Sequence, residues 1–109
     1  MPDSFVKMAE SFKALGDPTR LKMLRLLAAH KEHSLCVGAL AQRLGITQPA
    51  ASQHLKVLKN VGLVEPCRKG FHVHYAINAE VLAAWKAQLD ELCRFSSEQC
   101  VPSENCHKQ

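Results

Sequence analysis

The feature that most constrains this chain is a pair of short helices predicted on either side of a glycine turn. Residues 37–44 have helical spacing of apolar side chains, and Gly45 follows where a helix would end, because glycine adopts the left-handed C-cap conformation without steric cost. Thr47 stands where its hydroxyl can cap the first turn of a second helix. Two helices joined by about three residues form a helix-turn-helix. We therefore predict a mainly helical domain organised around this unit.

The second of these helices contains no acidic residue. Its sequence, TQPAASQHLKVLKNVG over residues 47–62, has two lysines and several amide or hydroxyl side chains. At about 100° per residue, one arc of the helix is apolar and the other is polar. The polar arc consists of Gln48, Ser52, Gln53, Lys56, Lys59 and Asn60.

This polar arc is typical of a helix that enters the major groove of DNA. Amide side chains pair with base edges, serine donates or accepts, and lysine binds phosphate or guanine, whereas an acid would face phosphates. We expect DNA contacts from Gln48, Ser52, Gln53, Lys56 and Lys59. The alternative is a solvated amphipathic helix that merely lacks acids. His54 falls within the apolar arc, so we expect it to pack or hydrogen-bond inside the domain rather than to bind phosphate.

A β-hairpin is predicted directly after this helix. Residues 71–77 alternate between apolar and polar side chains, with Phe71 and every second residue after it on one face. Residues 63–67 are predicted to pair with this strand. Pro66 favours an edge position, because proline has no N–H to donate to a neighbouring strand.

The positive charge of the chain is concentrated in the same region. From residue 33 to residue 78 the only acid is Glu65, against five cations, and this segment carries the whole net charge of +4. Two of these cations, Arg68 and Lys69, precede Gly70 in the predicted hairpin turn, where we expect contacts to phosphate or the minor groove. A solvated turn is the alternative. A localised basic face is expected of a protein that binds a polyanion.

Three further helices surround the helix-turn-helix. The first is predicted over residues 5–15, and the last is predicted from Ala79. A helix between the first and the helix-turn-helix begins at Asp17-Pro18, because the carboxylate can cap free N–H groups and proline has no N–H that would lack an acceptor there. The first and last helices carry more apolar side chains than one small core can use, which predicts a homodimer through both. We place the folded domain at residues 1–95 and a flexible cysteine-containing tail at residues 96–109.

Several classes of protein are excluded by what the sequence lacks. No apolar run approaches the ~18 residues of a membrane span, and the N-terminus has no signal-peptide pattern, so we expect a cytoplasmic protein without a membrane partner. The chain also has no glycine-rich phosphate loop, nucleophile elbow, zinc-protease helix or Cys-x-x-Cys pair. We therefore do not expect an enzyme.

In combination, four segments resemble the ArsR family of metal-responsive winged-helix repressors. They are LGDPTRL at residues 15–21, LCV at residues 35–37, the recognition helix at residues 48–58, and GLV at residues 62–64. The resemblance covers roughly residues 5–95. It implies a winged helix-turn-helix, a homodimer built by the first and last helices, and repression of an operon until an inducer binds.

The usual inducer sites of the resembled family are incomplete in this sequence. Arsenic-sensing members carry further cysteines near the position of Cys36, but here Gly38 stands where a second cysteine would be and Ala39 where an acid is usual. Zinc-sensing members use acid and histidine pairs on the last helix, and this predicted helix has no histidine.

Three thiols near the C-terminus remain as candidate metal ligands. Cys93, Cys100 and Cys106 belong to an odd set of five cysteines, which argues against a disulfide framework. A three-sulfur site suits trivalent arsenic or antimony, and lead or cadmium could also use it. Some arsenic-responsive members of the resembled family place cysteines near the end of this helix. The alternative is that these cysteines are incidental.

The sequence therefore predicts a cytoplasmic, homodimeric winged helix-turn-helix repressor that binds operator DNA and is released by a thiophilic metal(loid). Two alternatives remain open. One is a repressor in which two of the same cysteines form a reversible disulfide in response to oxidant. The other is a soft-metal-binding interaction module that has the fold without binding an operator.

Overall fold

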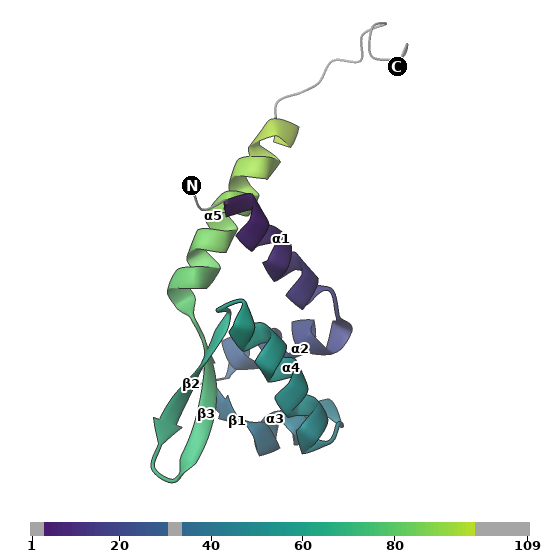
Figure 1. Cartoon of the computed structure of the whole chain (residues 1–109), viewed down its shortest axis with the longest axis vertical. Coiled ribbons are helices and arrows are strands. Elements are labelled where there is room, and N and C mark those ends of the chain that lie inside the picture. The colour runs from purple at the N-terminus through teal and green to yellow at the C-terminus, as the bar shows by residue number, and fades with distance from the viewer. Residues whose placement is uncertain (1–3, 31–33, 98–109) are drawn as a thin grey trace, which may run out of the picture.

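The computed structural model describes residues 4–30 and 34–97 (Figure 1). Within these residues the chain forms five helices and three strands. In chain order they are α1 (Ser4–Leu15), α2 (Pro18–Ala29), β1 (Ser34–Cys36), α3 (Val37–Leu44), α4 (Gln48–Asn60), β2 (Val64–Lys69), β3 (His72–Ile77) and α5 (Ala79–Ser97). The predicted fold class, mainly helical with a β-hairpin wing, is confirmed.

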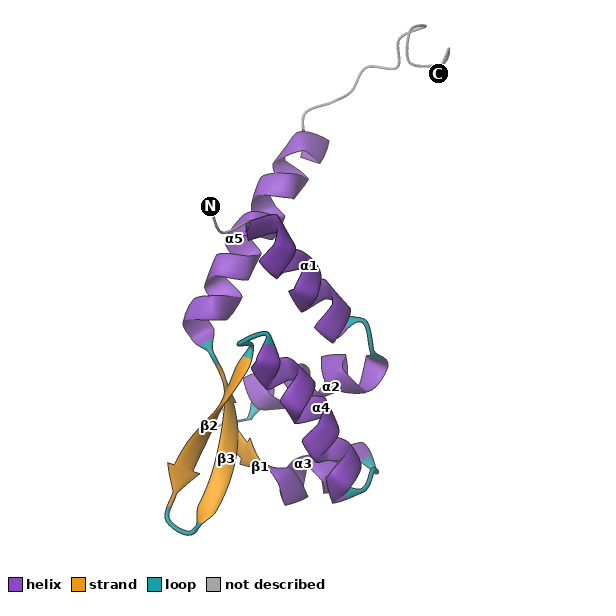
Figure 2. Ribbon diagram, viewed as in Figure 1, coloured by secondary structure: helices purple, strands orange, loops and turns teal. Residues whose placement is uncertain are grey.

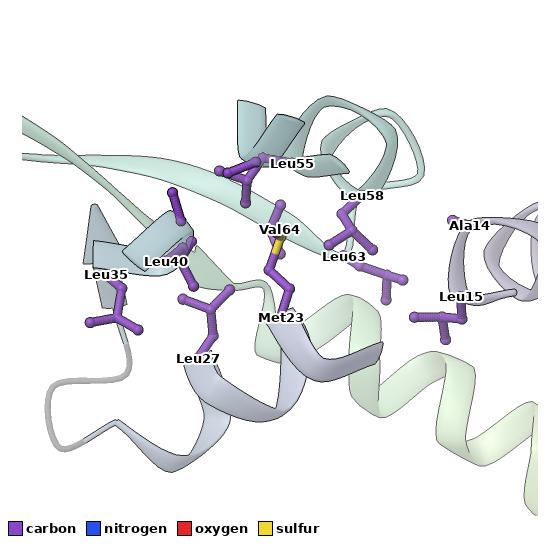
Figure 3. Packing of buried hydrophobic residues seen from close by; sticks show 12 residues of the cluster. Ala14, Leu15, Met23, Leu27, Leu35, Leu40, Leu55, Leu58, Leu63 and Val64 are labelled. Atoms are coloured by element: carbon purple, nitrogen blue, oxygen red, sulfur yellow. The ribbon is translucent and has the colours of Figure 1, made fainter. Parts of the chain in front are cut away.

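The core lies between α2, α3, α4 and the sheet (Figure 3). The apolar arc predicted for α4 supplies Ala51, Leu55 and Leu58, which are all buried. The most deeply buried large side chains are Met23, Leu27, Leu40, Leu55, Leu58, Leu63 and Val64. Burial of each such side chain stabilises the domain by about 1.5–3 kcal/mol. The opposite arc of α4 is thereby held at the surface.

The three strands form an antiparallel sheet in the order β1-β3-β2 (Figure 2). Pro66 therefore lies on an edge strand, as predicted. The short strand β1 is not predicted from the sequence, because three residues are too few to show an alternating pattern. It forms by pairing with the edge of β3 that β2 leaves open, from Ser34 opposite Ala76 to Cys36 opposite His74.

The hairpin turn differs from the predicted one. Backbone pairing continues to Lys69 opposite His72, so Arg68 and Lys69 belong to β2 and the turn consists of Gly70 and Phe71 alone. Gly70 has φ of 64°, a left-handed conformation that glycine adopts readily and that closes such a short turn. The alternation of the sequence does not reveal where pairing stops.

Helices α1 and α5 project from this core at the end of the molecule opposite the hairpin tip (Figure 1). They contact each other through Phe12 and Trp85, whose ring centroids lie 5.2 Å apart in an edge-to-face arrangement. No helix in the part of the chain that the structure describes has the length and apolar character needed to cross a membrane. The predicted boundary between residues 95 and 96 falls within the last turn of α5, and residues 98–109 of the predicted tail lie outside the described residues.

Candidate nucleic-acid interface

The turn between α3 and α4 is closed by the two capping residues that the sequence predicts. Gly45 ends α3 with φ of 69°, and its N–H donates to the carbonyl groups of Ala41 and Gln42. The Thr47 hydroxyl accepts a hydrogen bond from the N–H of Ala50, at 3.2 Å. Both caps satisfy backbone groups that the helix ends would otherwise leave without partners. The two caps therefore define where α3 ends and where α4 begins.

The solvent-facing side of α4 is polar and free of acids. All six residues of the predicted polar arc are exposed, and they are Gln48, Ser52, Gln53, Lys56, Lys59 and Asn60. The structure thus brings together on one face five of the seven residues predicted to contact DNA. Whether they contact DNA stays a prediction.

His54 is half-buried and hydrogen-bonds within the domain, as predicted. Its Nδ1 lies 3.1 Å from Nη1 of Arg20, which can only donate, so Nδ1 accepts this hydrogen bond. Arg20 also donates from Nε to the carbonyl oxygen of Ala14 at the end of α1. The recognition helix is thus connected to the junction of α1 and α2. No local sequence pattern indicates this connection, because Arg20 and His54 are 34 residues apart.

Asp17 stands beside this pair and caps α2. Its Oδ2 accepts hydrogen bonds from the backbone N–H groups of Thr19 at 2.9 Å and Arg20 at 3.1 Å, and lies 3.9 Å from Nδ1 of His54. The hydrogen bond from the Arg20 backbone lowers the pKa of Asp17, partial burial opposes that effect, and the positive charge of Arg20 lowers the pKa further. The charged form of Asp17 is therefore favoured in the folded protein.

The wing carries the other two residues predicted to contact DNA. Arg68 is exposed on β2, opposite Val73 of β3, and Lys69 follows it at the end of β2. No Asp or Glu occurs from residue 66 to residue 79. The tip of the hairpin and the turn between α3 and α4 lie toward the same end of the molecule, away from α1 and α5 (Figure 1).

Comparison with known proteins identifies this arrangement. Residues 17–66 match the family model described as bacterial regulatory protein, arsR family. The chain is 40% identical over 91 residues to an uncharacterized HTH-type transcriptional regulator of Methanocaldococcus jannaschii, covering 83% of this chain and 99% of that protein. The chain belongs to the ArsR family of regulatory proteins.

Other members of the ArsR family support the same assignment. The arsenical resistance operon repressor of Escherichia coli is 37% identical over 97 residues, covering 88% of this chain and 80% of that protein. An ArsR-like regulator from Rhodococcus sp. RHA1 superposes with a TM-score of 0.74 at 26% identity, covering 86% of each chain. The homodimeric winged helix-turn-helix DNA-binding domain of a possible ArsR-family regulator from Mycobacterium bovis superposes at 0.65 with 29% identity, covering 90% of each chain. These fold and sequence relatives are transcriptional regulators, not enzymes.

Of the three predicted metal ligands of this ArsR-family protein, one lies within the residues that the structure describes. Cys93 is exposed on α5, whereas Cys100 and Cys106 lie outside the described residues. Cys36 and Cys67 are half-buried on β1 and β2. Within residues 4–30 and 34–97, no three His, Cys, Asp or Glu side chains are grouped so that they could hold a metal ion. The three-cysteine site therefore stays a prediction.

Proposed function

We propose that this protein is a homodimeric transcriptional repressor that binds operator DNA and releases it when trivalent arsenic or antimony binds Cys93, Cys100 and Cys106. The observation that carries the DNA-binding part is the exposed, acid-free face of α4. Gln48, Ser52 and Gln53 lie toward its N-terminal end, the part of a recognition helix that reaches base edges. Lys56 and Lys59 follow as phosphate contacts, with Arg68 and Lys69 on the wing.

A dimer would supply the second half of the DNA-binding surface. Helices α1 and α5 expose large apolar side chains, among them Val6 at 54%, Phe12 at 43% and Leu92 at 45%. A cleft of about 500 Å³ opens between α1, the end of α4 and α5. It is lined in part by Trp85, whose buried Nε1 has no hydrogen-bond partner among the described residues. A second copy packed on α1 and α5 would cover the exposed apolar side chains and the cleft.

Such a dimer places two recognition helices on one face of DNA. In dimeric helix-turn-helix proteins the helices enter successive major grooves about 34 Å apart, on a near-palindromic site. The homodimeric M. bovis relative supports this arrangement. Any change in the angle between protomers would then move the two helices out of register with the grooves.

The inducer is proposed from the cysteines and from the relatives. Cys93 lies on α5, one of the two helices assigned to the dimer, so an ion bound there would act on the interface directly. Relatives named for resistance to arsenicals and to cadmium belong to the same family. Three thiolates suit trivalent arsenic or antimony, and lead or cadmium are the next candidates. The ligand must bind the DNA-free form more tightly, by about 1–3 kcal/mol, to release the operator.

The test is a release assay on the full chain. A fluorescent duplex is selected from a random-sequence pool by the wild-type protein, and its anisotropy is followed while sodium arsenite is added. We expect tight, salt-dependent binding and release by arsenite. The response should survive in Cys36→Ser and Cys67→Ser and disappear when Cys93, Cys100 and Cys106 are all changed to serine.

Each other outcome has a defined meaning. Failure to select or bind any duplex overturns the repressor function and favours a metal-binding interaction module. An undiminished response in the triple-serine protein overturns the proposed ligands. Release by hydrogen peroxide in metal-free buffer, with none by arsenite, favours a disulfide-forming sensor instead.

A further inference from the structure

The tip of the wing carries a phenylalanine whose side chain is fully exposed to solvent. Phe71 is 102% exposed, more than any other large apolar residue in the described part of the chain. It shares the two-residue turn with Gly70, where an added Cβ would meet no atom within 4 Å beyond the adjacent residues. The turn is therefore short and surrounded by open space, and the Phe71 ring stands fully in solvent. Single exposed apolar residues are common, so its surroundings must decide its partner.

Those surroundings favour a polyanion. Arg68 lies on the adjacent β2 and Lys69 precedes the turn, while His72 follows it opposite Lys69. No acid stands within the hairpin after Glu65. A basic tip of one protomer would repel the same tip of another, whereas it is attracted to the phosphates that border a DNA groove. Charge complementarity thus selects DNA over a second copy of the chain.

The shape of the tip selects the minor groove. The B-DNA minor groove is about 6 Å wide, too narrow for a two-stranded ribbon lying flat, but open to a glycine turn that carries one ring. Proteins that bind this groove commonly combine cations with an apolar wedge between base pairs. The hairpin tip and the start of α4 lie toward the same end of the molecule, so both can approach one duplex (Figure 1).

We propose that Phe71 enters the minor groove beside the site read by α4 and wedges between two adjacent base pairs. Arg68 and Lys69 then bind the phosphates on either side. The wedge favours a pyrimidine–purine step at this position, because such steps unstack most easily. This inference rests on the proposed operator binding and adds a residue that senses the deformability of the flanking DNA.

The test compares four full-length proteins on the selected duplex: the wild type, Phe71→Ala, Phe71→Leu and the control Val73→Ala. Val73 is 39% exposed on the same hairpin. We expect Phe71→Ala to weaken binding about tenfold without changing the dependence on salt, because it removes apolar contact and no charge. Phe71→Leu should retain most of the affinity and Val73→Ala nearly all. Because the Phe71 side chain is exposed, its loss should leave the unfolding curve unchanged.

A base analogue makes the wedge itself visible. With 2-aminopurine placed in turn at each flanking position, binding of the wild type should raise its fluorescence at one step, and Phe71→Ala should abolish that rise. Unchanged affinity and fluorescence in Phe71→Ala would overturn the wedge and leave the repressor function standing. A loss of self-association without a change in DNA binding would overturn it as well. A wild type that binds no duplex would instead remove the proposed function.

Discussion

The guanidinium of Arg20 lies with Nη1 3.1 Å from Nδ1 of His54, so the start of α2 is tied to the middle of the recognition helix. The same side chain donates to the carbonyl of Ala14 in α1. One residue therefore connects three helices, of which α1 is proposed to form the dimer and α4 to read DNA. The hydrogen bonds of Arg20 thus link the proposed dimer helix α1 to α4.

Replacing His54 by alanine removes the acceptor of Arg20 and should lower the free energy of unfolding by about 1 kcal/mol. A larger loss is not expected, because His54 remains 24% exposed and water can reach the guanidinium. Urea unfolding at fixed protein concentration measures the change. His72→Ala, at an exposed site on the wing, is the matched control. Equal losses in the two variants would show that the Arg20–His54 bond adds nothing to stability.

The lowered pKa of Asp17 predicts that the folded protein loses stability in acid. Its pKa is lower in the folded protein than the reference value of 3.8, so between the two values the unfolded chain binds more protons. The stabilisation is complete above the unfolded pKa and disappears as the pH falls through the folded pKa. Asp17→Asn keeps an oxygen to cap α2 but has no charge to titrate. Urea unfolding across this range should show a flatter acid limb for the variant, and parallel curves would contradict the assignment.

The features that the sequence predicted are those set by neighbouring residues. The Asp17 and Thr47 caps, the Gly45 stop and the two arcs of α4 follow from local geometry, and all are present. Strand β1 and the bond from Arg20 to His54 depend on contacts between distant parts of the chain, which no local pattern records. The predicted DNA face of α4 is exposed because the apolar arc on the opposite side of the helix packs on the core.

Phe71 shows the limit of a period-two pattern. The alternation over residues 71–77 assigns it to the apolar face of a strand, together with residues that pack on the core such as Tyr75 and Ile77. In the structure the strand begins at His72, and Phe71 is left in the turn. The pattern identifies the two faces of a strand but not the residue at which a hairpin reverses. The position of that reversal decides whether the Phe71 side chain packs on the sheet or is exposed at the tip.

The proposed dimer predicts that an acid on α1 will separate the protomers. Val6 is 54% exposed, and Val6→Asp would place a carboxylate in an apolar interface, which is unfavourable unless the charge is paired. We expect the dissociation constant of the dimer to rise at least about tenfold, equivalent to about 1.4 kcal/mol. Sedimentation velocity over a dilution series measures it. Leu21→Asp on α2, at 52% exposure, is the control, and equal weakening by both would place the interface elsewhere.

Replacing a lysine of α4 should change the salt dependence of DNA affinity, whereas replacing a glutamine should not. Lys56 is exposed on the polar arc, so Lys56→Gln should weaken all duplexes alike and reduce the slope of log affinity against log salt by about 1 per protomer, or about 2 for the dimer. Gln53→Ala should keep the slope and instead relax the preference for one base pair, because an amide reads base edges and carries no charge. The control is Lys86→Gln, an exposed residue of α5, the helix that extends away from the hairpin tip (Figure 1). A slope that stays the same in Lys56→Gln, or falls equally in Lys86→Gln, would show that α4 does not lie against the phosphates.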